Sequence, residues 1–255
     1  MTIPHYPDKH GHPAAFSAAD VARHNPRLAI PDMPANVIIT FQQHTLQYLT
    51  RQYKGRQAER FFGEFHTLRG ARVPTGVVGN FGIGAPAAVF VLEWLAALGA
   101  RRFIIVGFAG GMQETLNAGD LILCDRALRD EGTSHHYLPP QVFARPDAAL
   151  TTRLAEALTA AGLTPLTGPS WTTDAPFRET LPEIDHYSRM GMFTVEMEAA
   201  AVFAAGEFLG IPCAAAFSVG DSLKDGRWQV DFDRAAMHRG LEQLADAAMQ
   251  AFEAG

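Results

Sequence analysis

The sequence predicts an α/β protein in which helices cover both sides of a largely buried sheet. From about residue 37 onward, strand-like segments alternate with segments that have the apolar spacing of helices. The strand-like segments 102–106 (RFIIV) and 211–219 (IPCAAAFSV) are apolar enough to be buried. With 255 residues, 47% of them hydrophobic, the chain can bury one large core, and no repeat or linker divides it. We therefore expect an N-terminal arm, residues 1–35, and one domain, residues 36–255.

The first part of the chain has the weaker signals. Residues 1–35 are rich in Pro and His, and we expect an irregular arm with one helical turn. A short strand at 37–41 precedes a helix that ends near Tyr53. The β-compatible runs within 61–81 are broken by Gly70, Pro74 and Gly76.

From Gly82 the signals are stronger. A turn at Gly82 and Gly84 leads into a helix that starts near Pro86 and ends at Gly99. The strand 102–106 follows and ends at Gly107. Further segments are expected to be strands near 120–128, 163–169 and 211–219, and helices at 147–161, 196–209 and from 231 or 233 to 252.

Composition excludes several classes of partner. The net charge is −6 and the isoelectric point about 5.9, so the surface is not made for nucleic acid or anionic membranes. The two cysteines, Cys124 and Cys213, lie in apolar stretches, which fits a reduced compartment. The N-terminus is too polar for a secretory signal, and no apolar run approaches the ~20 residues of a membrane span. We expect a cytoplasmic protein.

Metal and phosphate-loop chemistry is not indicated. The adjacent residues His135 and His136 would point different ways in a strand, and neither HxxxH nor CxxC spacing occurs. The sequence also lacks a GxSxG elbow and a Walker loop. We therefore expect no metal and no organic cofactor.

Two glycine-rich loops follow predicted strands. The loop 79–84 (GNFGIG) opens a helix, where backbone N–H groups favour an anion, although a tight turn explains it equally well. The loop 107–111 (GFAGG) comes directly after a buried strand. Such a loop is either a turn or one wall of a ligand site.

Three acidic residues stand beside apolar segments. Glu196 and Glu198 precede an Ala-rich run, where a carboxylate is costly unless it has polar partners. Glu196 is either a cap of the helix N-terminus or a ligand contact. Glu198 is suited to accept hydrogen bonds from a pair of sugar hydroxyls. Asp221 ends a buried strand at the sheet edge where ligands usually bind, and a helix cap is its alternative.

Taken together, these segments resemble the purine and uridine phosphorylase family, most closely its uridine phosphorylase-like members. The order and spacing match over roughly residues 75–225. VEMEAAA (195–201) and the preceding TTDAPF (172–177) are the specific motifs, and the glycine loops support them. The other matching segments are GIGAPAA at 82–88, VGFAGG at 106–111 with Gln113, GDL at 119–121 and RDEGTSHHYLPP at 129–140. The resemblance implies a three-layer α/β/α sandwich around a mixed, partly barrel-like central sheet, assembled as a homo-oligomer, a dimer or a hexamer.

The resemblance also implies roles for single residues. Glu198 would bind the ribose 2′- and 3′-hydroxyls and stabilise the positive charge that develops on the sugar, and Met197 would pack under the ribose. Phe177, Arg178, Gly110 and Glu196 would form the base site, with Phe177 as the stacking candidate. Gly84, Phe108 and Ala109 would border the phosphate or nucleophile pocket.

Asp221 matches an acid that protonates or hydrogen-bonds the departing base in purine-cleaving relatives, whereas pyrimidine-specific relatives generally lack it. A serine that usually precedes this acid is replaced by Gly220. Arg234 stands at the distance of a supporting arginine. This acid favours a purine, while the uridine-type resemblance favours a pyrimidine, and both remain open.

Three pieces that hold phosphate in the family are missing. The first strand is followed by TFQQH (40–44) in place of a Pro-Gly-Asp-Pro loop and an arginine. Ile105 stands where a strand arginine is usual, and Phe108 replaces a threonine. Arg60, Arg72, Arg129 or the helix N-terminus at Gly84 could compensate.

Three functions are therefore compared. The first is a nucleoside phosphorylase, which uses inorganic phosphate as co-substrate and makes ribose 1-phosphate. The second is a nucleosidase, in which water replaces phosphate. The third is a non-catalytic nucleoside-binding protein. In an oligomer, the His-rich arm (His5, His10 and His12) could enter a neighbour's site, or it could be a disordered tail.

Overall fold

The computed structural model describes residues 6, 8–25, 30–58, 61–223, 228–229 and 233–254. His5 and Arg60 lie outside these residues. The strands are β1 (Asn36–Ile39), β2 (Gly55–Gln57), β3 (Glu64–Leu68), β4 (Thr75–Gly79), β5 (Arg102–Gly111), β6 (Leu121–Asp130), β7 (Phe143–Ala144), β8 (Leu166–Thr173), β9 (Thr194–Glu196) and β10 (Cys213–Ser222). The α-helices are α1 (Ala18–His24), α2 (Gln43–Gln52), α3 (Ala85–Leu98), α4 (Ala148–Ala160), α5 (Leu181–Arg189), α6 (Ala199–Leu209) and α7 (Arg234–Glu253), and short 3₁₀ turns include η3 (Ser134–His136) and η4 (Pro176–Arg178).

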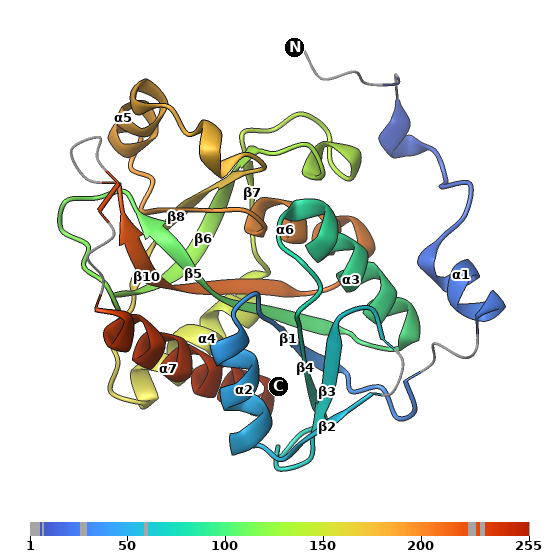
Figure 1. Cartoon of the computed structure of the whole chain (residues 1–255). Coiled ribbons are helices and arrows are strands. Elements are labelled where there is room, and N and C mark those ends of the chain that lie inside the picture. Colours follow the sequence, from blue (N-terminus) through green and yellow to red (C-terminus); the bar gives the residue numbers. More distant parts are fainter. Residues whose placement is uncertain are drawn as a thin grey trace.

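The central sheet is mixed and partly closed into a barrel, as expected. The strand order is β10-β6-β8-β9-β5-β1-β4-β3-β2, and β10 also pairs with β5. The strands β5, β10, β6, β8 and β9 therefore form a closed ring, and β1 to β4 extend it as an open sheet (Figure 1). The strand β5 joins the two parts because it pairs with β1 near its start and with β9 at Gly110 and Gly111.

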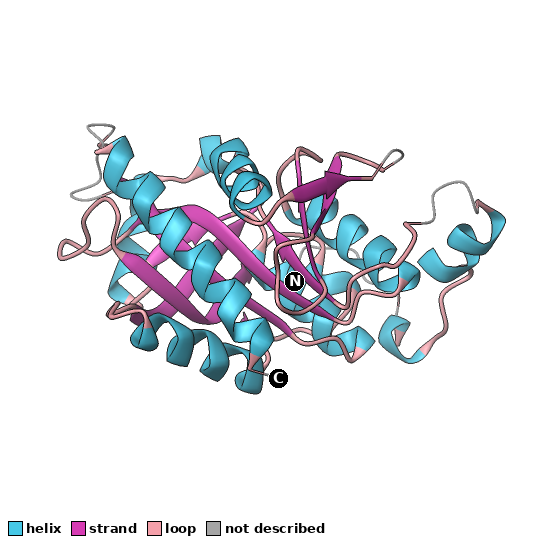
Figure 2. Cartoon of the chain, turned by 90° about the horizontal axis from the view of Figure 1, so that it is seen from below, coloured by secondary structure: helices cyan, strands magenta, loops and turns pink. Residues whose placement is uncertain are grey.

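Helices cover both faces of the sheet (Figure 2). The helices α3 and α6 pack into one apolar cluster, and α2, α4 and α7 pack into the other. Successive residues of β5 alternate between them: Phe103 and Ile105 belong to the first cluster, Ile104 and Val106 to the second. This alternation explains why the strand is apolar on both faces. The three-layer α/β/α fold is thus confirmed.

Several predicted boundaries differ from the structure. The helix expected to start at residue 196 begins at Ala199, because Glu196 ends β9 and Glu198 occupies the N-cap position. The strand expected at 163–169 is β8, which runs on to Thr173. The arm contains α1, a seven-residue helix with a Ser17–Asp20 capping box, in place of one turn.

Among the elements that were not predicted, α5 and β9 lie beside the cavity described below. The helix α5 is short and amphipathic, and the capping box of Thr180 and Glu183 at its start was the available signal. The strand β9 has only three residues, and its pairing with β5 and β8 comes from the tertiary structure. Both elements matter because they border the candidate site.

A close approach of α7 to β10 gives a test of the packing. The helix residue Gly240 is buried, and a Cβ there would overlap the side chain of Ser218 and lie 3.1 Å from Leu121 Cδ2. We expect Gly240→Ala to lower the free energy of unfolding by about 1–3 kcal/mol, although alanine favours a helix. Urea denaturation measures this. Gln243→Ala, on the exposed side of the same helix, is the control, and equal stability of both variants would contradict the packing described here.

Candidate active site

A cavity of about 530 Å³ lies at the carboxyl ends of β5 and β10, beside β9 and the turn before α5. Its lining is mostly apolar, with carboxylates as the charged groups. Ligand sites of α/β proteins are usual at this edge of the sheet. The lining residues are Phe41, Gln42, Ile83, Gly107, Phe108, Ala109, Gly110, Pro176, Phe177, Glu179, Leu181, Ile184, Val195, Glu196, Met197, Glu198, Phe217, Asp221, Leu223 and Trp228.

Glu198 is buried at the junction of β9 and α6. Its Oε1 accepts a hydrogen bond of 2.6 Å from the backbone N–H of Gly84, at the N-terminus of α3. Burial, and then the neighbouring Glu196, raise the pKa of Glu198 to about 8. The carboxyl group is therefore fixed in place, lines the cavity and is costly to ionise without a ligand.

Glu196 caps the helix that follows it. Its Oε2 accepts from the backbone N–H groups of Glu198 (2.8 Å) and Ala199 (2.7 Å). Its Oε1 accepts from the hydroxyls of Ser170 and Thr172 on β8. The cap alternative thus explains this acid, while its predicted contact with a base stays a prediction. Burial raises the pKa of Glu196 as well.

Asp221 and Gly110 face each other across the β5–β10 pair. A bulge between Val219 and Asp221 shifts the register, so that Asp221 pairs with Gly110. A Cβ on Gly110 would lie 2.8 Å from Asp221 Oδ1, so a side chain at this position would displace the Asp221 carboxylate. Asp221 Oδ2 accepts a hydrogen bond of 2.8 Å from Trp228 Nε1. Arg234 is exposed at the start of α7 and does not line the cavity, so Trp228 has the place expected for it.

The turn before α5 supplies the mouth of the cavity. Phe177 lines it and is fully exposed, and its stacking role stays a prediction. Arg178 is exposed and lies outside the lining, so the structure does not bring it to the predicted base site. Its neighbour Glu179 lines the cavity instead. Glu179 was not predicted as a site residue, although it follows the motif TTDAPF (172–177) by two residues.

Phe108 and Ala109, which were predicted to border the nucleophile pocket, line the cavity. The side chain of Phe108 is 44% exposed. A Cβ on Gly220 would lie 2.9 Å from the ring of Phe108, so the ring occupies the volume that a side chain at 220 would need. Gln42 also lines the cavity, and its Oε1 is buried without a hydrogen-bond partner among the described residues. Gly84 is outside the lining, and its N–H is already used by Glu198.

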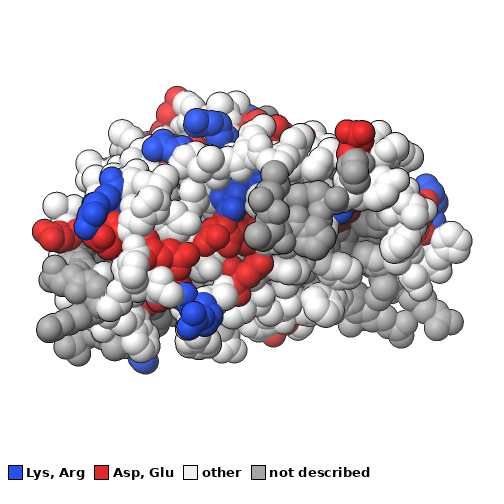
Figure 3. Space-filling view, turned by 90° about the horizontal axis from the view of Figure 1, so that it is seen from above, with Lys and Arg blue, Asp and Glu red and all other residues white. Residues whose placement is uncertain are grey.

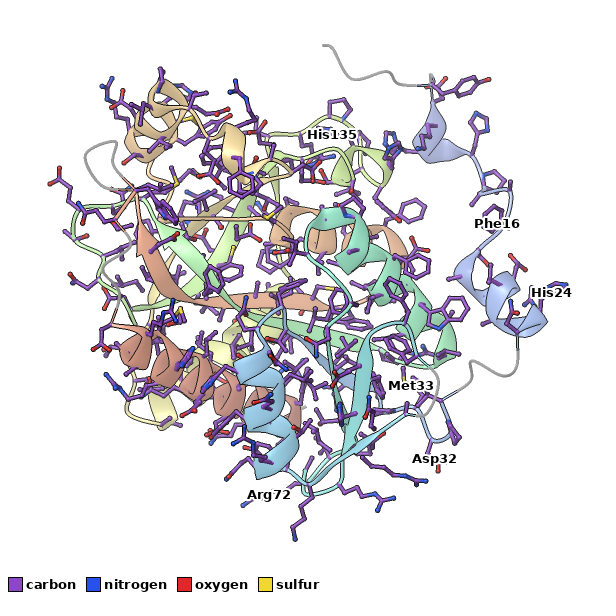
Figure 4. The ribbon with its side chains drawn as sticks, in the orientation of Figure 1. Phe16, His24, Asp32, Met33, Arg72 and His135 are labelled. Carbon is purple, nitrogen blue, oxygen red and sulfur yellow. The ribbon has the colours of Figure 1, made fainter. Side chains whose placement is uncertain are left out.

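The arginines considered as substitutes for the missing phosphate ligands lie elsewhere. The guanidinium of Arg129 is occupied by Ser134 and by backbone carbonyls of the loop 138–141. Arg72 is exposed, forms a 3.5 Å ion pair with Glu253 and lies at the end of the molecule near β2 (Figure 4). Among the described residues, no Lys or Arg lines the cavity, whereas Glu179, Glu196, Glu198 and Asp221 do.

Acidic side chains gather near the middle of the face of the molecule that is seen from above (Figure 3). The arm contacts the domain through His10, whose ring nitrogen lies 3.1 Å from the backbone oxygen of His135.

Within the described ranges, no helix is both long and apolar enough to cross a membrane, and no cluster of His, Cys, Asp and Glu is arranged for a metal ion.

Comparisons with known proteins identify the family to which the chain belongs. A sequence profile of the phosphorylase superfamily matches residues 36–253. A guanosine phosphorylase of Halorubrum lacusprofundi is 31% identical over 57% of this chain and 60% of its own length. A uridine phosphorylase of Haemophilus influenzae is 37% identical over 38% of this chain and 39% of its own length. The chain thus spans less than two thirds of the length of these curated relatives.

Solved structures show the same fold. The uridine phosphorylase of Vibrio fischeri ES114 matches with a TM-score of 0.78 at 23% identity, covering 88% of this chain and 94% of its own. The AMP nucleosidase of Bacteroides thetaiotaomicron matches with a TM-score of 0.74 at 22% identity, covering 93% and 97%.

The solved structures thus share the fold of this chain, and the sequence profile defines its class as that of the phosphorylase superfamily. The chain belongs to the phosphorylase superfamily, and the family resemblance seen in its sequence is confirmed.

The raised pKa of Glu198 predicts a dependence of stability on pH. The ordinary value is 4.5 and the folded-state value about 8, so between these limits the unfolded chain loses a proton that the folded chain keeps. The stability present below about pH 4.5 is therefore lost as the pH rises towards 8. We expect Glu198→Gln to raise the free energy of unfolding by about 1–3 kcal/mol at pH 8 and by much less at pH 5. Denaturation at both pH values, with the exposed Glu207→Gln as control, checks this, and no gain at pH 8 would contradict it.

Proposed function

We propose that this protein cleaves the N-ribosidic bond of a nucleoside. The observation that carries the proposal is the fixed, buried carboxyl group of Glu198 in the cavity, held by the Gly84 N–H. Ribose hydroxyls could supply the donors that such a carboxylate needs to be stable when ionised. Met197 lines the cavity next to it and offers an apolar surface to the sugar.

The chemistry follows from the charge of this group. As the bond between C1′ and the base stretches, the ribose gains oxocarbenium character. A fixed carboxylate stabilises that positive charge more than it stabilises the neutral nucleoside, and this difference lowers the barrier. Phe177 and Gly110 would contact the base, and Asp221 would hydrogen-bond or protonate it as it leaves.

The first form of the proposal is phosphorolysis, in which inorganic phosphate attacks C1′ and ribose 1-phosphate is released. The superfamily and the relatives named as phosphorylases support this form. Phosphate would need cations from outside the described lining of the cavity, such as those of a second subunit.

A second form, hydrolysis, is favoured by the charge and volume of the nucleophile pocket. Four carboxylates and no described Lys or Arg line the cavity. A dianion would be repelled there, whereas water carries no charge and is small. The ring of Phe108 further reduces the space, and the unpartnered amide oxygen of Gln42 could accept a hydrogen bond from the attacking water.

We further propose that the enzyme is cytoplasmic and forms a homo-oligomer, a dimer or a hexamer. Its partners are small-molecule nucleosides, with inorganic phosphate as the co-substrate if the reaction is phosphorolysis.

Product analysis distinguishes the three functions. Purine and pyrimidine nucleosides are incubated with the full chain, with and without phosphate, and free base, ribose and ribose 1-phosphate are quantified. Ribose 1-phosphate formed only with phosphate identifies a phosphorylase, and free ribose in both conditions identifies a nucleosidase. Tight binding without any product would contradict the enzymatic proposal and favour the nucleoside-binding protein.

Glu198→Gln tests the sugar site. We expect turnover to fall by about 10²–10³-fold, because the amide cannot neutralise the developing charge, while the fold is retained. Steady-state kinetics and circular dichroism measure the two effects, with Glu207→Gln as control. Unchanged turnover would remove Glu198 from the mechanism.

Asp221→Asn tests the leaving group. The amide oxygen still accepts from Trp228 but the side chain cannot deliver a proton, so we expect kcat/KM for purine nucleosides to fall by about 10²–10⁴-fold. Pyrimidine nucleosides should lose much less. Equal losses for both classes of nucleoside would refute the leaving-group role of Asp221.

A further inference from the structure

Trp228 is a large aromatic side chain at the cavity to which the proposed reaction gives no task. It lines the cavity and is 64% exposed, whereas the other two tryptophans of the chain, Trp94 and Trp171, are buried. Tryptophan is enriched at binding sites because one side chain offers both an apolar ring and a polar N–H. The indole of Trp228 is thus available to a ligand of the cavity.

The backbone holds Trp228 beside the end of β10. The N–H of the next residue, Gln229, donates to the backbone oxygen of Ser222 over 2.8 Å, so the chain folds back antiparallel onto the strand. The N–H of Leu223 donates to a backbone oxygen of β5 over 2.9 Å. The place of the indole is therefore set by the strand pair that also carries Asp221.

The carboxyl group of Asp221 is contacted from two sides. The Nε1–H of Trp228 donates to Asp221 Oδ2 over 2.8 Å. Asp221 Oδ1 lies against Gly110, since a Cβ there would come within 2.8 Å of it. An indole N–H is a neutral donor and cannot accept, so this bond orients the carboxyl group without adding a charge. Such an orientation matters to an acid that acts on one atom of a ligand, because proton transfer requires hydrogen-bond distance.

The indole can contact Asp221 and a nucleobase at the same time. Its N–H lies in the plane of the ring system, so the bond to Asp221 uses the edge of the ring and leaves the faces available. Every nucleobase has a flat face that stacks on aromatic side chains. Phe177, the predicted stacking residue, lines the same cavity from the turn η4.

We propose that Trp228 is a positioning residue for Asp221 and, through the face of its ring, a binding residue for the nucleobase. The assignment rests on the proposed cleavage of an N-ribosidic bond, because that reaction places a base next to Asp221. One side chain then holds the base and orients the acid, so that the ring nitrogen and the carboxyl group meet in a defined geometry.

Two substitutions of Trp228 separate these roles. Phenylalanine keeps a stacking face but has no N–H, so in Trp228→Phe we expect kcat to fall by about tenfold or more, with KM nearly unchanged. Trp228→Ala removes the face as well, so KM should rise by about 5- to 100-fold. The control is Trp94→Phe, a matched change at a buried tryptophan outside the lining, which should leave both constants unchanged. An unchanged kcat in Trp228→Phe would overturn the positioning role, and an equal KM in both Trp228 variants would overturn the contact with the base.

A double-mutant cycle shows whether Trp228 acts through Asp221. In Asp221→Asn the side chain delivers no proton, so its exact orientation matters little. Adding Trp228→Phe to this variant should therefore lower kcat hardly further. If the two losses multiply in full, Trp228 acts independently of Asp221 and the positioning role is wrong.

Tryptophan fluorescence tests the contact with the base without any turnover. Because Trp228 is exposed and the other two indoles are buried, a base stacked on it should quench part of the emission. Adenine, hypoxanthine and uracil are added to the full chain, with correction for their absorbance. We expect at least one of them to quench the emission of the wild type and of Trp94→Phe, but not that of Trp228→Phe. No quenching by any of the three bases would overturn the contact.

The two assays also separate this assignment from the proposed function. If a base quenches Trp228 but no nucleoside is cleaved, the contact with the base is right and the proposed function fails. If nucleosides are cleaved and Trp228→Phe behaves as the wild type in both assays, the proposed function stands and the role of Trp228 is refuted.

Discussion

The arrangement of the site depends on the buried carboxylate of Glu196. One of its oxygens accepts from two backbone N–H groups at the start of α6, and the other accepts from two hydroxyls of β8. Thr172 also accepts from the N–H of Ala200, so β8, β9 and α6 are joined by one hydrogen-bond network. A buried charge is tolerated when all its hydrogen bonds are made. Glu198 is held at the cavity because this network fixes the turn between β9 and α6.

The carboxyl groups of the cavity lie in an electrostatically unfavourable environment. Glu196 stands two residues from Glu198 and helps to raise its pKa, and Asp221 does the same for Glu179. Four carboxylates therefore line one cavity whose other lining residues are mostly apolar. Like charges in a mostly apolar cavity lower the stability of the folded protein, and such arrangements occur mainly at binding sites. A ligand that offers hydroxyl donors and develops positive charge would reduce this electrostatic repulsion, whereas a bound anion would increase it.

Phe108 and Gly220, two positions at which the resemblance implies other residues, are close to each other in the fold. The ring of Phe108 lies where a side chain at position 220 would have to stand. A side chain at position 220 would therefore require this ring to move. Phe108 lines the same cavity as Gln42 and Glu198.

The sequence by itself determined the fold class and the positions of the main chemical groups. Apolar strands alternating with helices specify a sheet covered on both faces, because each residue type must match the local period of burial. The motifs VEMEAAA and TTDAPF were enough to recognise the family. Glu198 and Asp221 were found because acids next to apolar strands or helices need a polar partner.

The tertiary structure decided which of those groups meet. It placed Arg178, Arg129 and Arg72 away from the cavity, brought Trp228 to Asp221 in place of Arg234, and assigned Glu196 to the cap of α6. It also showed that Glu179, just before α5, lines the cavity. Contacts between residues distant in the chain depend on the register of β5 with β9 and β10, and three-residue strands and bulges leave little pattern in a sequence.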